Sequence, residues 1–108
     1  MKTVTLALGD RNIELRYNLY ALAWFEKETG LKITQLNKQS FGANVLLNML
    51  YAGMLWKKDE DPSFPDLQTV GKWIDTGPKF YETADKLAEV MNYFLEDPTS
   101  TEKKTENQ

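Results

Sequence analysis

Apolar and polar residues alternate near the N-terminus of the chain. A period of two residues is typical of a strand with one buried face, and the Gly, Asp and Asn within residues 9–12 are typical of a turn. The pattern therefore predicts a β-hairpin with a four-residue connection. Because a lone hairpin is only marginally stable in water, its apolar face must pack against another element. The alternating apolar residues are Val4, Leu6, Leu8, Ile13 and Leu15.

A first helix is predicted between Asn18 and Gly30. The Asn18 side chain can accept a backbone N–H at the helix start, and Gly30 favours the left-handed conformation that ends many helices. Apolar residues lie on two sides of this helix. One side carries Leu19, Leu22, Ala23 and Phe25, and the other carries Tyr20 and Trp24.

A second helix is predicted from Phe41 to about Lys58, with Ser40 as its cap. Its polar stripe is narrow and consists of Asn44 and Asn48, continued by Tyr51 and Leu55. A helix that is apolar almost all round is normally enclosed by other elements, so we expect this one at the centre of the domain. Gly42 and Gly53 share one side and would allow a neighbour to approach closely. The remaining apolar positions are Val45, Leu46, Leu47, Met49, Leu50, Ala52, Met54 and Trp56.

Two further helices are predicted after a charged loop at residues 57–65. Asp66 caps the third, which ends at Gly77, and Pro78 occupies the first turn of the fourth, where its missing N–H is harmless. Pro98 prevents the fourth helix from continuing. The third helix has an apolar stripe of Leu67, Val70 and Ile74, with Trp73 on its flank. The fourth has a stripe of Phe80, Ala84, Leu87, Ala88, Met91 and Leu95.

The predicted fold class is α+β and mostly α: an N-terminal β-hairpin followed by about four helices, with the second helix central. Residues 1–96 are expected to form this single domain. Residues 97–108 contain no large apolar side chain, so they are expected to be a disordered polar tail.

Composition excludes several kinds of chemistry. The 108 residues include no Cys and no His, which excludes disulfides, thiolate or imidazole metal sites, and triads built on Ser–His or Cys–His. Thirteen basic and 16 acidic residues give a net charge of −3, which argues against a nucleic-acid partner. No apolar run approaches the roughly 20 residues of a membrane span, and the N-terminus lacks the apolar block of a signal peptide.

The acidic clusters favour solvent exposure over catalysis. Glu26 and Glu28 end a helix, and residues 59–61 lie in a proline-containing loop without the spaced oxygen ligands of a hard-cation site. We therefore expect no catalytic residue, no metal and no cofactor. An enzyme that uses carboxylates or lysine is the last of the alternatives.

Thirteen aromatic residues are a large supply for a chain of this size. Most must lie in the core, but Trp and Tyr are also enriched at binding hot spots. Residues off the main apolar stripes are the candidates for such a binding role, and Leu55 and Tyr93 are among them. The same surface could serve a partner protein or a second copy of this chain. The predicted protein-binding residues are Tyr20, Trp24, Tyr51, Met54 and Trp56.

The order of segments along the chain says more about function than composition does. Residues 11–17 lead into residues 18–30 (NLYALAWFEKETG), residues 50–54 read LYAGM, and residues 65–75 read PDLQTVGKWID before the last helix. Over residues 4–96 this order resembles the tail assembly chaperones of long-tailed bacteriophages and prophages of Gram-positive hosts. The resemblance implies a helical protein with a small hairpin and no catalytic residues.

The resemblance also implies partners. Such chaperones bind the tape measure protein, keep it soluble and help to recruit tail-tube proteins in the host cytoplasm, and they are absent from the mature virion. Many are also made in a longer, frameshifted form, for which Lys103 and Lys104 mark a candidate site. The alternative is a small cytoplasmic adaptor or regulatory module unrelated to phage.

Overall fold

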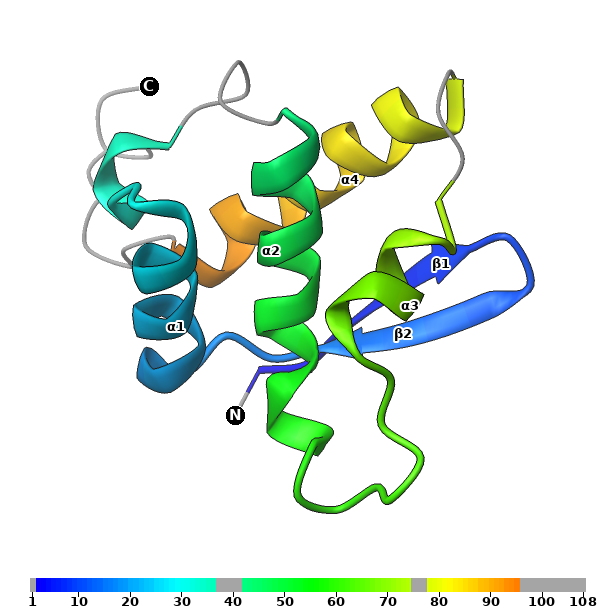
Figure 1. Cartoon of the computed structure of the whole chain (residues 1–108). Helices are drawn as coiled ribbons and strands as arrows, with labels where there is room; N and C mark the ends of the chain where they lie inside the picture. The colour runs from blue at the N-terminus through cyan, green and yellow to red at the C-terminus, as the bar shows by residue number, and fades with distance from the viewer. Residues whose placement is uncertain (1, 37–41, 75–77, 96–108) are drawn as a thin grey trace.

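The computed structural model of the protein describes residues 2–36, 42–74 and 78–95 (Figure 1). The chain begins with two antiparallel strands, β1 (Val4–Leu8) and β2 (Arg11–Leu15). The described residues between the α-helices include the 3₁₀ turns η1 (Ile33–Gln35) and η3 (Leu55–Lys57). The α-helices are α1 (Leu19–Thr29), α2 (Ala43–Met54), α3 (Leu67–Gly71) and α4 (Pro78–Leu95). The predicted α+β class, a hairpin followed by four helices, is confirmed.

The hairpin turn is shorter than the sequence pattern predicts. Leu8 pairs directly with Arg11, so the connection is the two residues Gly9 and Asp10. Gly9 has φ of 62° and Asp10 has a negative φ, which is the pattern of a type II′ turn. Two-residue primed turns match the twist of the strands, and this explains why Arg11 and Asn12 extend β2 instead of the loop.

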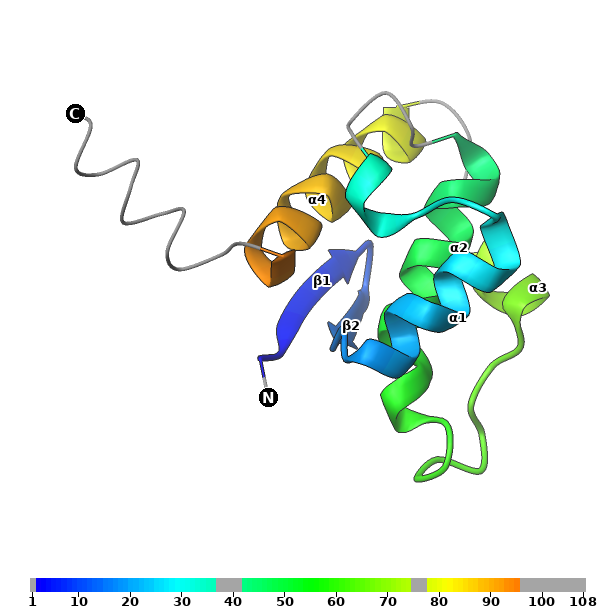
Figure 2. The ribbon, with the colours of Figure 1, turned by 90° about the vertical axis from the view of Figure 1, so that its left-hand side faces the viewer.

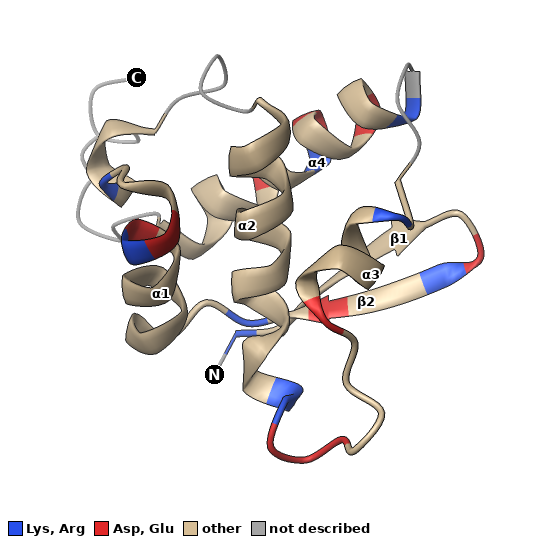
Figure 3. Ribbon diagram, viewed as in Figure 1, with Lys and Arg blue, Asp and Glu red and all other residues tan. Residues whose placement is uncertain are grey.

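Helix α2 is the centre of the domain, as predicted. It contacts α1, α3, α4 and β2, and nine of its 12 residues are buried. Figure 1 shows α1 on one side of α2, the hairpin and α3 on the other, and α4 behind it, and Figure 2 shows that the hairpin lies toward α4 whereas α3 lies away from it. No charged residue occurs along α2, whereas charges gather at the hairpin turn and in the loop after η3 (Figure 3).

Only Asn44, the first residue of the expected polar stripe of α2, faces solvent. Asn48 is only 4% exposed, and Tyr51 and Leu55 are also buried. The Asn48 Nδ2 atom donates to the Asn44 carbonyl at 2.8 Å and to the Asn44 Oδ1 at 2.9 Å. The rest of the stripe is buried because α1, α3, α4 and β2 pack around α2, and the Asn48 Nδ2 finds its acceptors within its own helix.

Gly53 lets the hairpin approach α2. A Cβ atom at this position would lie 2.6 Å from Cζ of Tyr17, and the Arg16 N–H donates to the Gly53 carbonyl at 2.9 Å. The predicted close approach is therefore confirmed at Gly53. At Gly42 no described atom lies within 4 Å of such a Cβ, so that part of the prediction is wrong.

Most predicted helix ends are confirmed. The Asn18 Oδ1 accepts from the Ala21 N–H at 2.8 Å, Gly30 has φ of 74°, and the Asp66 Oδ1 accepts from the Thr69 N–H at 2.8 Å. The start of α2 differs, with Gly42 at the N-cap; Ser40 and Phe41 lie outside the described residues.

The C-terminal half of the chain departs from the pattern in two places. Helix α3 ends at Gly71, because the Lys72 and Trp73 N–H groups tighten the last turn by donating to carbonyls three residues earlier. Leu95 of α4 is 42% exposed, because Phe94 takes the inward position against Tyr17, with ring centroids 5.1 Å apart. Gly77, Pro98 and the predicted polar tail at 97–108 lie outside the described residues.

The cap of α3 predicts a measurable acidity. Hydrogen bonds from the backbone and side chain of Thr69 lower the pKa of Asp66 below its ordinary value of 3.8. Because the pKa of Asp66 is lower in the folded protein than in the unfolded chain, the ionised cap stabilises the fold at pH values above 3.8. This contribution is lost as the pH falls through the pKa of the folded state. A ¹³C NMR titration of the carboxyl groups should place the midpoint of Asp66 below 3.8. A midpoint at or above that value would contradict the cap.

Candidate protein-binding site

Helix α1 leaves large apolar side chains in solvent. Ala21 and Phe25, four residues apart, make the buried side that packs on α2. Leu19 is 83% exposed and Tyr20 is 68% exposed, and Ala23 is exposed as well. The sequence pattern grouped Leu19 and Ala23 with Phe25, but only Phe25 of these three reaches the core.

A row of aromatic side chains extends from this exposed surface across the molecule. Tyr20 and Trp24 are four residues apart on α1, so they lie on the same side of the helix. The Trp24 and Tyr51 rings have centroids 5.6 Å apart, and Tyr51 lies 5.6 Å from Phe64 in the loop after η3. We call Tyr20, Trp24, Tyr51 and Phe64 the aromatic row. Its exposure falls from Tyr20, which is exposed, through Trp24, which is half-buried, to Tyr51, which is buried.

Tyr51 belongs to the core and not to the free surface that the sequence pattern predicts. It is buried, and its hydroxyl donates to the Pro65 carbonyl at 2.9 Å. Burial and the negative charge of Asp66 raise the pKa of Tyr51, which keeps the hydroxyl protonated as a donor. Tyr51 therefore packs between Trp24 and Phe64 within the aromatic row, and its hydrogen bond fixes the loop that carries Phe64.

Met54 and Trp56 lie apart from the aromatic row. Met54 is buried, so its predicted place on a free surface is wrong, for the same reason as that of Tyr51: α2 is enclosed. Trp56 is half-buried. Its Nε1 donates to the Glu14 carbonyl at 3.0 Å, and the Arg16 guanidinium lies 3.8 Å from its ring centroid. Trp56 thus joins the end of α2 to β2, and the five predicted residues divide into two groups.

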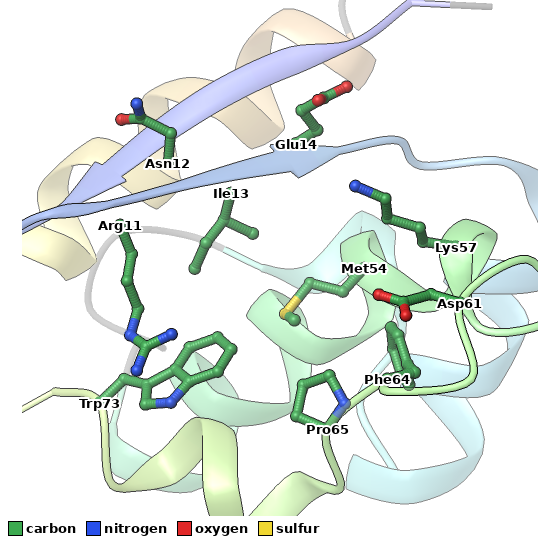
Figure 4. Close-up of a pocket in the computed structure, with 10 residues that line it drawn as sticks. All are labelled: Arg11, Asn12, Ile13, Glu14, Met54, Lys57, Asp61, Phe64, Pro65 and Trp73. Carbon is green, nitrogen blue, oxygen red and sulfur yellow. The ribbon is translucent and has the colours of Figure 1, made fainter.

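Met54 contributes to a second feature, a cleft of about 270 Å³ between β2 and the segments that follow α2 (Figure 4). We call it the β2 cleft. Arg11 and Ile13 point into it, whereas Asn12 and Glu14 point away from it. The Arg11 guanidinium lies 4.3 Å from the centroid of the Trp73 ring. The other residues that line the cleft are Met54, Lys57, Asp61, Phe64 and Pro65.

Sequence reasoning missed Phe64 and Trp73 as parts of a site. Phe64 lies between Ser63 and Pro65 in a polar loop, and the sequence pattern predicts Trp73 only as a residue on the flank of a helix. A large aromatic residue within a charged, proline-containing loop is the signal that could have pointed to Phe64, because such loops rarely need one unless it packs against the body of the protein.

No metal site is evident in the part of the chain that the structure describes: no group of three or more acidic side chains there could hold an ion. Among the same residues, no helix is long and apolar enough to cross a membrane. No protein-family model matches this chain, and no curated protein or solved structure matches it either.

Proposed function

We propose that this protein is a phage tail assembly chaperone that binds the tape measure protein without covalent chemistry, keeps it soluble and helps to recruit tail-tube proteins. The observation that carries the proposal is the exposure of Leu19 and Tyr20 at the start of α1, where the aromatic row begins. The resemblance of residues 4–96 to such chaperones supports it.

The exposed surface has the chemistry that a helical client requires. Large apolar side chains that cluster in solvent mark interaction sites, and Tyr and Trp are frequent hot spots. An amphipathic helix docks through apolar residues spaced three or four apart, which a surface of Leu19, Tyr20 and Trp24 would match. The net charge of −3 favours dispersal of a protein that exposes such residues.

The proposal predicts that the double variant Leu19→Ser, Tyr20→Ser loses client binding. Truncation of a hot-spot residue costs about 2 kcal/mol or more, which is roughly thirtyfold in affinity. The fold should survive, because both side chains are exposed in the free protein. Co-expression with the tape measure protein, followed by measurement of its soluble fraction, tests the activity, and circular dichroism tests the fold.

Tyr81→Ser is the matched control, because Tyr81 is 69% exposed but lies on α4. This variant should bind like the natural protein. A tape measure protein that is no more soluble with this chain than without it would contradict the proposal and favour an adaptor unrelated to phage. Equal losses from the α1 and α4 variants would contradict the choice of α1.

A further inference from the structure

The outer edge of β2 carries backbone groups without partners. In a hairpin with a two-residue turn, the residues that flank the turn form a doubly hydrogen-bonded pair, and such pairs alternate along the strands. Because Leu8 pairs with Arg11, the backbone groups of Asn12 and Glu14 point away from β1. On this edge the Glu14 carbonyl accepts a hydrogen bond from the Trp56 Nε1. Among the described residues, the Asn12 N–H, the Asn12 carbonyl and the Glu14 N–H have no hydrogen-bond partner.

The β2 cleft lies directly along this free edge (Figure 4). Successive side chains of a strand point to opposite faces, so every second residue of a strand added here would point into the cleft beside Ile13. There it would meet Met54, Phe64 and Pro65. This wall is apolar, and the cleft volume of about 270 Å³ has room for one or two side chains. An apolar residue therefore fits opposite Ile13.

Arg11 determines which residue of an added strand fits at the next position that points into the cleft. Its side chain points into the same cleft two residues before Ile13, and it forms no ion pair with any described carboxylate. Asp61, at the other end of the cleft, already accepts hydrogen bonds from the Ser63 N–H at 2.9 Å and the Ser63 hydroxyl at 2.7 Å. Opposite charges directly across a pair of strands stabilise each other, so an acidic residue fits opposite Arg11.

We propose that the β2 cleft binds an extended segment of a partner protein as a third strand, with an apolar residue opposite Ile13 and an acidic residue opposite Arg11. In an antiparallel arrangement the apolar residue precedes the acidic one by two positions. The residue between them forms both of its backbone hydrogen bonds with Asn12. This interaction uses a surface separate from Leu19 and Tyr20 and does not rest on the function proposed above.

The probe is a capped peptide of threonines that contains one leucine and, two residues later, one aspartate. Amide hydrogen exchange followed by NMR should show that the peptide slows exchange at Asn12 and Glu14. N-methylation of the peptide residue between leucine and aspartate should abolish binding, because it removes the donor to the Asn12 carbonyl. Loss of an exposed charge pair is worth about threefold in affinity, so Arg11→Gln should weaken binding by that factor. Lys27→Gln, which removes a cation from α1, should not weaken it.

Three results would overturn the proposal. The first is unchanged exchange at Asn12 and Glu14 with millimolar peptide, and the second is equal binding of the N-methylated peptide. The third is protection of both amides without peptide that disappears on dilution, because a second copy of the chain would then occupy the edge. The double variant Leu19→Ser, Tyr20→Ser should bind the peptide normally, which separates this site from the surface of α1.

Discussion

Replacing Phe25 with alanine is expected to lower the free energy of unfolding by about 3–5 kcal/mol, the usual cost of removing a buried phenyl ring. Phe25 is fully buried and, with Ala21, forms the contact of α1 with α2. A domain of this size is stable by only about 5–15 kcal/mol, so the variant should be close to unfolding at room temperature. Urea denaturation followed by circular dichroism measures the effect.

Leu19→Ala is the matched control for that experiment. It removes a large apolar side chain from the same helix, but one that is 83% exposed. Exposed substitutions away from special features change stability by no more than about 0.5 kcal/mol. If the two variants lost similar stability, the assignment of Phe25 to the core and Leu19 to the surface would be wrong.

Gly53→Ala is expected to destabilise the protein, although alanine is the better helix former by about 1 kcal/mol. The added Cβ would lie 2.6 Å from Cζ of Tyr17 and 2.9 Å from a methyl group of Leu15. Neither side chain can easily move, because both are buried and the Tyr17 hydroxyl donates to the Met49 carbonyl at 2.7 Å. Overpacking of a tight core costs about 1–3 kcal/mol, which outweighs the gain in helix propensity.

Gly71→Ala provides the comparison. Gly71 is also helical, but its nearest neighbour is a methyl group of Leu47 at 3.3 Å, which is the end of a half-buried and flexible side chain. We expect this variant to be close to neutral in thermal denaturation, with a clearly lower melting temperature for Gly53→Ala. A Gly53→Ala protein as stable as the natural one would show that the hairpin does not press on α2 as described.

The secondary structure of this protein follows largely from short-range rules. Asn18, Gly30 and Asp66 act on backbone groups only a few residues away, so their effects on helix ends are readable in the sequence. The apolar character of α2 on nearly all sides likewise predicts its central position. The boundaries that were wrong, at the hairpin turn and at the end of α3, depend on backbone geometry over one or two residues.

The candidate site depends on contacts between distant parts of the chain. A helical pattern shows which residues share a side of α2, but not how many neighbours cover that side. Tyr51 and Met54 are therefore core residues, while Leu19 and Tyr20 remain exposed. The aromatic row needs α1, α2 and the loop after η3 together, since Phe64 reaches Tyr51 only through the fold.

The sequence by itself determined the class of fold, the central helix and the absence of cysteine and histidine chemistry, because each follows from composition or from local periodicity. Only the tertiary structure decided which apolar side chains stay in solvent and that the edge of β2 borders a cleft. The physical reason is that burial is a property of all the elements that surround a residue. Arg11 and Trp73 are far apart in the chain, and only the tertiary structure brings the Arg11 guanidinium to 4.3 Å from the centroid of the Trp73 ring.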